Sequence, residues 1–150
     1  MRGFRPHLTV AAVIERGGRF LLVEEHVGGQ RVFNQPAGHV EDGETLLDAV
    51  RRETHEETGW AFEPTLLLGV YRWFNPENGE TFIRFAFRGE LGQQLAPGPV
   101  DPAIVAADWH GDEAVHDGTL PLRSPLVRRC IVDYRAGCGY PLTALVDLSG

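Results

Sequence analysis

The chain has 150 residues, enough for one domain that buries a substantial core without disulfides. Its 21 Asp and Glu residues outnumber 14 arginines, and the net charge of −7 argues against a nucleic-acid-binding surface. The sequence contains no lysine, which excludes Schiff-base chemistry and a Walker A phosphate loop. No apolar run reaches the roughly 20 residues of a membrane span, and the two cysteines are too few for a disulfide scaffold, so we expect a soluble cytoplasmic protein.

Two strands rich in Val, Ile and Leu are predicted near the amino terminus. They cover residues 7–14 and 19–25 and flank a Gly-Gly turn, so we interpret them as a hairpin. A second glycine pair precedes a short strand at residues 31–34. The next element is a helix over about residues 44–58, which Gly59 ends as a C-terminal cap.

The second half of the chain is predicted to hold three more strands and a helix. Two long strands flank a turn rich in Asn, Pro and Gly, which is a hairpin signal. A Pro-rich loop at residues 96–102 precedes another strand, and Ser124 with Pro125 begins a second helix that Gly137 ends. This order predicts an α/β fold with a mixed β-sheet sandwiched between α-helices, in which residues 1–150 form a single domain with a carboxyl-terminal helix and tail.

The first predicted helix carries its charges in an unusual place. On a helical wheel, Glu53 and Glu57 fall within about 20° of Leu46, inside the apolar arc, and Glu56 lies on the edge of that arc. Thr58 falls on the opposite arc, where a solvated residue is expected. Burying like charges unpaired would be very unfavourable, whereas a hard divalent cation would bind carboxylate oxygens. The helix therefore predicts a metal site, with a solvated acidic helix end as the alternative.

The residues around this helix follow a long pattern. Five residues separate Gly38 from Glu44, and seven more lead to the run RETHEETGW at residues 52–60. This pattern resembles the Nudix box, and every fixed residue of the box is present. The one departure is Thr54, at a position that the family fills with a bulky apolar residue, so its hydroxyl needs a partner. Segments outside the box, among them residues 122–127, extend the resemblance to bacterial NudJ-type phosphatases.

The resemblance implies a fold and a chemistry. Nudix proteins are α/β/α sandwiches that bind Mg²⁺, or Mn²⁺ in its place, through the helix glutamates and the carbonyl of the first glycine of the box. In this chain those ligands correspond to Gly38, Glu53, Glu56 and Glu57. Arg52 resembles the arginine that orients a carboxylate through a forked ion pair, so catalysis is assigned to Glu53, Glu57 and Arg52. Which glutamate acts as general base stays open.

Substrate-binding residues are expected outside the helix. Asn34 and Gln35, just before the box, are candidates for hydrogen bonds to a base-like ring, and Trp73 is a candidate to stack on it. Arg84 and Arg123 are candidates to bind an outer phosphate in a bidentate manner. For the aromatic residue the alternative is a place in the core, and for the arginines it is a solvated surface.

The function that the resemblance implies is Mg²⁺-dependent hydrolysis of a small-molecule phosphate anhydride, by a monomer or homodimer without nucleic-acid or membrane partners. The implied substrates are nucleoside di- and triphosphates, hydroxymethylpyrimidine diphosphate and thiamine diphosphate. One alternative is a Nudix hydrolase of nucleotide sugars or dinucleotides, because the fold does not fix the leaving group. The other is a non-catalytic nucleotide-sensing Nudix domain, although such domains usually lack glutamates of the box.

Overall fold

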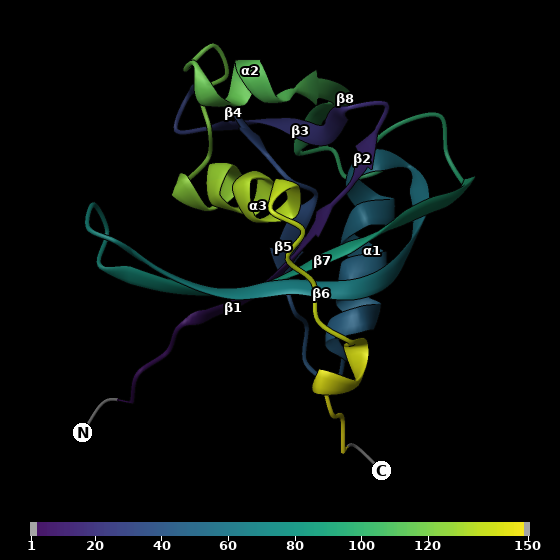
Figure 1. Cartoon of the computed structure of the whole chain (residues 1–150). Helices are drawn as coiled ribbons and strands as arrows, with labels where there is room; N and C mark the ends of the chain where they lie inside the picture. The colour runs from purple at the N-terminus through teal and green to yellow at the C-terminus, as the bar shows by residue number, and fades with distance from the viewer. Residues whose placement is uncertain (1–2, 149–150) are drawn as a thin grey trace.

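The computed structural model describes residues 3–148, which form two β-sheets packed with helices (Figure 1). The elements in chain order are β1 (His7–Val13), β2 (Glu15–Arg16), β3 (Arg19–Val27), β4 (Gln30–Asn34), β5 (Ala37–His39), α1 (Leu46–Thr58), β6 (Trp60–Asn75), β7 (Glu80–Gln94), β8 (Ile104–Gly111), α2 (Asp112–His116), α3 (Pro125–Arg135) and the 3₁₀ helix η1 (Leu142–Ala144). None of the helices in this part of the chain has the length and apolar character needed to cross a bilayer.

The first sheet has the strand order β5-β1-β7-β6 and mixes parallel with antiparallel pairs. β1 runs parallel to β7, from His7 opposite Phe82 to Val13 opposite Arg88, and antiparallel to β5. β6 and β7 form the long predicted hairpin, whose tip projects beyond the helices (Figure 1). In the second sheet β3 lies between β4 and β8 and also pairs with the short β2. The predicted mixed-sheet α/β fold is therefore confirmed.

The first sheet lies between α1 and α3 (Figure 1), and the alternation of β1 explains how both faces are filled. Val10 and Ala12 belong to the apolar cluster that includes Val50 of α1. The alternate residues, Ala11 and Val13, belong to the cluster that includes the buried side of α3. Because one strand supplies both clusters, the two helices are fixed relative to each other across the sheet.

The predicted hairpin between the first two long strands is wrong. The Gly-Gly turn connects the two-residue strand β2 to β3. The long strand β1 pairs with β7 in the other sheet. The reason lies in the burial of β1, since every residue from Val10 to Ile14 is buried. A continuous buried run is typical of an interior strand with parallel pairing, which needs neighbours on both sides and cover on both faces.

The predicted helix ends agree closely with the structure. α1 begins two residues later than expected, because Thr45 is the N-cap and its Oγ1 accepts a hydrogen bond from the Asp48 N–H at 3.1 Å. Gly59 ends α1 with a φ of 83°, which a residue with a Cβ adopts at a cost. Ser124 caps α3 as predicted, and its Oγ accepts from the Leu126 N–H at 3.2 Å.

Two threonines of α1 are buried, and for Thr58 this corrects the prediction of a solvated position. A helical wheel assumes that the rest of the protein packs on one side of the helix. Here the loop after β7 also packs over the last turn, where the N–H groups of Leu95 and Ala96 donate to the Gly59 carbonyl. The hydroxyl of Thr54 donates to the Val50 carbonyl at 2.7 Å, and that of Thr58 donates to the Thr54 carbonyl at 2.7 Å. The helix itself therefore satisfies both hydroxyls.

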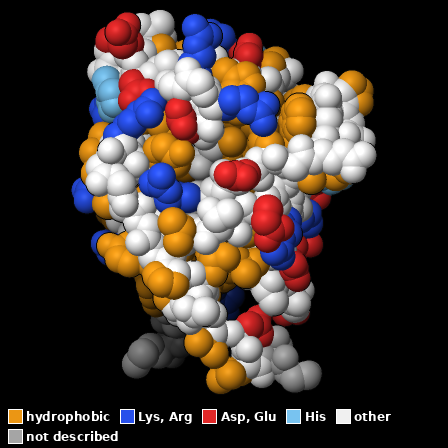
Figure 2. Space-filling view, turned by 45° about the vertical axis from the view of Figure 1, so that its right-hand side comes forward, with side chains coloured by type: hydrophobic (Ala, Val, Ile, Leu, Met, Phe, Trp, Pro, Cys, Tyr) orange, Lys and Arg blue, Asp and Glu red, His pale blue; other side chains and the backbone are white. Residues whose placement is uncertain are grey.

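The surface mixes side chains of all kinds. On the face in Figure 2, acidic and basic groups are interspersed with apolar ones, so the negative net charge is not collected into one patch there. Electrostatic attraction of a substrate therefore depends on local groups in a cleft and not on the charge of that whole face.

Candidate active site

The contact between β5 and α1 is very close, and Gly38 makes it possible. A Cβ added to Gly38 would overlap the carboxylate carbon and both carboxylate oxygens of Glu53. One residue earlier, the N–H of Ala37 donates to Oε1 of Glu57 at 2.9 Å. The backbone of β5 is thus in direct contact with two glutamates of the helix, and only glycine at residue 38 leaves room for Glu53 in this position.

Glu53 and Glu57 are buried, with 9% and 7% of their surface exposed. Burial raises the pKa of Glu57 to about 9, and the nearby Glu53 carboxylate adds to this rise. Burial also raises the pKa of Glu53, although its contact with Arg52 opposes the shift. Within residues 3–148 the hydrogen-bond partner of Glu57 is a backbone N–H. This carboxylate therefore lacks a positive counter-charge in the described part of the chain.

Arg52 connects the other carboxylates of the site. Its Nε and Nη2 form a fork on Glu44, at 2.6 and 2.9 Å, and this hydrogen bonding lowers the pKa of Glu44. Its Nη1 contacts Glu53 at 2.7 Å and Glu56 at 3.3 Å. Nη2 also donates to the His39 carbonyl at 3.0 Å. One guanidinium therefore fixes the helix glutamates relative to the end of β5.

The donors at this place suit a hard divalent cation. Glu53, Glu56 and Glu57 offer carboxylate oxygens, and Gly38, whose Cα packs against Glu53, offers a backbone carbonyl. No group of three or more His, Cys, Asp or Glu side chains is already gathered as a metal cage in residues 3–148. The Nη1 of Arg52 contacts two of the three carboxylates, Glu53 and Glu56, and it occupies oxygens that would otherwise face a cation. The all-oxygen donor set and the lack of a counter-charge on Glu57 both fit such an ion.

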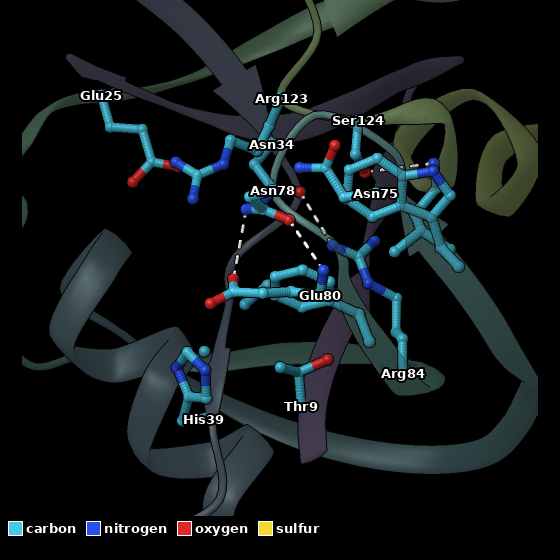
Figure 3. Close-up of a pocket in the computed structure, with 15 residues that line it drawn as sticks. Thr9, Glu25, Asn34, His39, Asn75, Asn78, Glu80, Arg84, Arg123 and Ser124 are labelled. Atoms are coloured by element: carbon cyan, nitrogen blue, oxygen red, sulfur yellow. Dashed lines mark hydrogen bonds and ion pairs between the residues drawn. The ribbon is translucent and has the colours of Figure 1, made fainter. Parts of the chain in front are cut away.

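A cleft of about 290 Å³ adjoins this cluster at Ala37, Gly38 and His39 (Figure 3). Its other walls come from the β6–β7 hairpin, from the middle of β7 and from the start of α3. Four of the five predicted substrate-binding residues line it, namely Asn34, Trp73, Arg84 and Arg123. The fold thus brings together residues from four separate segments beside the predicted metal-binding helix.

Gln35 is the fifth predicted residue, and it does not line the cleft. Only 1% of its surface is exposed, and both ends of its amide have protein partners. Its Nε2 donates to the Val127 carbonyl at 2.9 Å, and its Oε1 accepts from Arg84 Nη1 at 2.8 Å. Gln35 therefore positions Arg84 against α3.

The structure adds four residues that sequence reasoning missed, namely His7, His39, Glu80 and Phe82. The Phe82 ring lies between Trp73 and His7, with centroid distances of 5.5 and 4.5 Å. The Nε2 of His7 pairs with Glu80 at 3.2 Å, and its Nδ1 lies 2.9 Å from the Nε2 of His39. The period-two pattern of β7 placed Phe82 on the same face as Arg84, but only the register between β1, β6 and β7 reveals the aromatic row.

Helix glutamates buried against a glycine backbone, beside a cleft lined by arginines, are the arrangement expected of a hydrolase that acts on phosphate anhydrides. The family model described as the NUDIX domain matches residues 5–130, and the chain belongs to this family. It is a Nudix hydrolase, and Nudix hydrolases generally use divalent metal ions. The family that the sequence pattern predicted is therefore confirmed.

Individual relatives support the same assignment. Phosphatase NudJ of Escherichia coli strain K12 is 40% identical over 146 residues, which cover 97% of this chain and 94% of the relative. The solved NUDIX hydrolase from Nitrosomonas europaea is 43% identical, with a TM-score of 0.92 over 97% of this chain and 99% of that one. The MutT NUDIX hydrolase from Burkholderia pseudomallei is 26% identical, with a TM-score of 0.73 over 86% and 98%. The predicted fold and the similarity to NudJ are confirmed.

Proposed function

We propose that the chain is a Mg²⁺-dependent pyrophosphohydrolase. It releases phosphate from nucleoside di- and triphosphates and from the thiamine-pathway compounds hydroxymethylpyrimidine diphosphate and thiamine diphosphate. The observation that carries this proposal is the burial of Glu53 and Glu57 against β5, at the wall of a cleft that contains two arginines. The similarity to Phosphatase NudJ over nearly the whole chain supports phosphate release.

The proposed metal ligands are Gly38, Glu53, Glu56 and Glu57. Bound Mg²⁺, or Mn²⁺, would neutralise anhydride oxygens and lower the pKa of a water molecule. Glu53 and Glu57 are the proposed catalytic residues, and the pH dependence of kcat would separate the general base from the ligands. Arg52 acts with them as a positioning residue, because its Nη1 contacts Glu53 and Glu56.

The cleft accepts the rest of the substrate in this proposal. Asn34 and Trp73 offer an amide and a half-buried ring to the organic group, and Arg84 and Arg123 offer guanidinium groups to phosphate. Gln35 contributes through Arg84. The volume of about 290 Å³ is at the lower end of ligand pockets, and a second hollow adjoins it at Trp73 and Arg123.

The test is the variant Glu57→Gln, which removes the charge of the more deeply buried carboxylate and keeps its shape. We expect Mg²⁺-dependent orthophosphate release to fall by about 100-fold or more, with an unchanged circular dichroism spectrum. Glu63→Gln is the matched control, because Glu63 is exposed and pairs only with Arg51 among the described residues. Turnover by Glu57→Gln at the level of this control would overturn the proposal.

The substrate screen distinguishes the alternatives. Nucleotides, thiamine diphosphate and nucleotide sugars are each incubated with and without Mg²⁺, and the products are identified. Orthophosphate supports the proposal, whereas a sugar phosphate or nucleoside monophosphate from a nucleotide sugar or dinucleotide would select the first alternative. Binding without turnover of any substrate would select the sensor, which the complete set of box glutamates argues against.

The setting of the enzyme is part of the same proposal. We place it in the cytoplasm as one domain of residues 1–150, acting as a monomer or homodimer on small molecules. The free thiols of Cys130 and Cys138 support a reducing compartment. Light scattering of the purified chain, with and without Mg²⁺, distinguishes monomer from homodimer.

A further inference from the structure

Arg84 is a buried cation without an anionic partner. Only 4% of its surface is exposed, although arginine is rarely buried unless it is paired. Its hydrogen-bond partners are neutral: Oε1 of Gln35 at 2.8 Å, Oδ1 of Asn34 at 3.0 Å and Sγ of Cys130 at 3.8 Å. Within residues 3–148 it makes no ion pair with an Asp or Glu side chain. The inner part of the cleft therefore carries an uncompensated positive charge, which is unfavourable until an anion enters.

The unused N–H groups of Arg84 lie on one edge of its guanidinium. Nη1 is occupied by Gln35 and Cys130, and Nη2 makes one bond, to Asn34. Nε is the one buried side-chain nitrogen or oxygen in residues 3–148 without a hydrogen-bond partner. Nε is covered from solvent, so an entering anion reaches it only after a small shift of the side chain. In a guanidinium, Nε–H and one Nη2–H are parallel, and such a fork fits two oxygens of one phosphate or carboxylate.

Groups of both signs surround Arg84 in the cleft, together with the positive end of a helix. The side chain extends toward Asn34 inside the cleft (Figure 3). Ser124, at the amino-terminal end of the 11-residue helix α3, lines the same cleft, and the helix dipole is positive at that end. Of the acidic side chains in the cleft, Glu25 pairs with Arg123 at 3.7 Å and Glu80 pairs with His7 at 3.2 Å. Both carboxylates therefore have other partners.

We propose that Arg84, beside the amino-terminal end of α3, forms an anion subsite that binds the terminal phosphate of the substrate. The subsite rests on the proposed function, and it adds the chemical group that the enzyme recognises, the terminal phosphate. The charged end of the substrate enters the buried part of the cleft, and the organic group stays near the half-buried rings of Trp73 and Phe82. Specificity then follows the phosphate chain, which all the proposed substrates share, and depends little on the organic group.

The first experiment measures anion binding without turnover. Inorganic phosphate is titrated into the full chain in the presence of a chelator, and binding is followed by calorimetry and by the rise in melting temperature. Arg84→Gln is expected to weaken phosphate binding by about 10- to 100-fold, the loss typical of a charge-assisted fork. Arg84→Lys, which keeps the charge without the fork, is expected to lie between Arg84→Gln and the unaltered protein.

Arg88→Gln is the matched control. It removes the same charge from the same strand, but Arg88 donates to the carbonyls of Tyr134 and Cys138 at 3.1 Å and does not line the cleft. Phosphate binding by this variant should equal that of the unaltered protein. The subsite would be overturned if the unaltered protein did not bind phosphate. It would also be overturned if Arg84→Gln and Arg88→Gln, both folded by circular dichroism, bound phosphate equally.

The second experiment compares KM values. If Arg84 binds the terminal phosphate, Arg84→Gln raises KM by a similar factor for a purine nucleotide, a pyrimidine nucleotide and thiamine diphosphate. A loss confined to one organic group would show that Arg84 reads that group, and would overturn the inference. The phosphate titration needs no substrate cleavage. Failure of the proposed hydrolysis would therefore leave the binding result interpretable, and loss of the subsite would leave Mg²⁺-dependent turnover measurable.

Discussion

Substituting Gly38→Ala isolates the contact between β5 and the helix glutamates. The new Cβ would occupy the position of the Glu53 carboxylate, so one of the two groups must move. β5 is held to β1 on one side, and its Ala37 N–H is bonded to Glu57 on the other. The carboxylate is the end of a flexible side chain, so we expect Glu53 to rotate away while the backbone stays in place.

The expected effect of Gly38→Ala on stability is small, and its expected effect on activity is large. Rotation of Glu53 disrupts its contact with Arg52 Nη1, and accommodating an extra methyl group costs about 1–3 kcal/mol. For a chain of this size that corresponds to a melting temperature lower by about 2–4 °C for each kcal/mol. Displacing a catalytic group by about 1 Å costs on the order of 100-fold in rate. Gly38→Ala is therefore expected to remain folded and to lose nearly all activity.

The assay combines Mg²⁺-dependent phosphate release, Mg²⁺ binding by calorimetry and thermal unfolding. Gly89→Ala is the reciprocal control, because its Cβ would contact the Glu63 carbonyl and the Phe62 ring, away from the cleft. It should lose stability and keep kcat. Gly111→Ala adds a Cβ in open space and should change neither quantity. Full activity of Gly38→Ala, or a loss explained entirely by unfolding, would refute the role given to this contact.

Two further predictions concern Arg52 and His110. Arg52→Lys loses the fork on Glu44, so Mg²⁺ affinity and kcat should each fall by about 10-fold or more, measured by calorimetry and phosphate release, and unchanged values would contradict the positioning role. Burial lowers the pKa of His110, whose ring packs on Phe33 with centroids 5.2 Å apart. Its contribution to stability is therefore complete above about pH 6.5 and declines as the pH falls. Melting temperatures from pH 7.5 to 5 should fall less for His110→Gln, and parallel curves would contradict this.

The helix and its charge pattern were predictable because both depend on local rules. Thr45, Gly59 and Ser124 act as caps through hydrogen bonds or backbone angles that involve only their near neighbours. The wheel placed Glu53 and Glu57 on the buried arc, and the structure buries both. The caps required residue type and the glutamates 3.6-residue periodicity, whereas the same wheel misplaced Thr58, which the loop after β7 covers.

The errors arose where long-range pairing decides the structure. The parallel pairing of β1 with β7 joins residues about half the chain apart, and no turn signal encodes it. The same pairing buries Arg84, which the sequence left open as a surface residue. Gln35 was expected to contact substrate, but the carbonyl of Val127 on α3 takes its amide instead. A side chain's role in the cleft depends on such distant partners, which the sequence does not reveal.

The sheet order relates the two uncompensated charges of the site. Thr9 of β1 lies opposite His39 of β5 on one side and opposite Arg84 of β7 on the other. The backbones of His39 and Arg84 are therefore two strand spacings apart, roughly 9–10 Å. The helix glutamates beside β5 would hold a metal ion and Arg84 would hold phosphate oxygens, so one diphosphate substrate would engage both. In this arrangement one substrate is held at both ends, and a variant that alters both Glu57 and Arg84 should lose less than the sum of the two single losses.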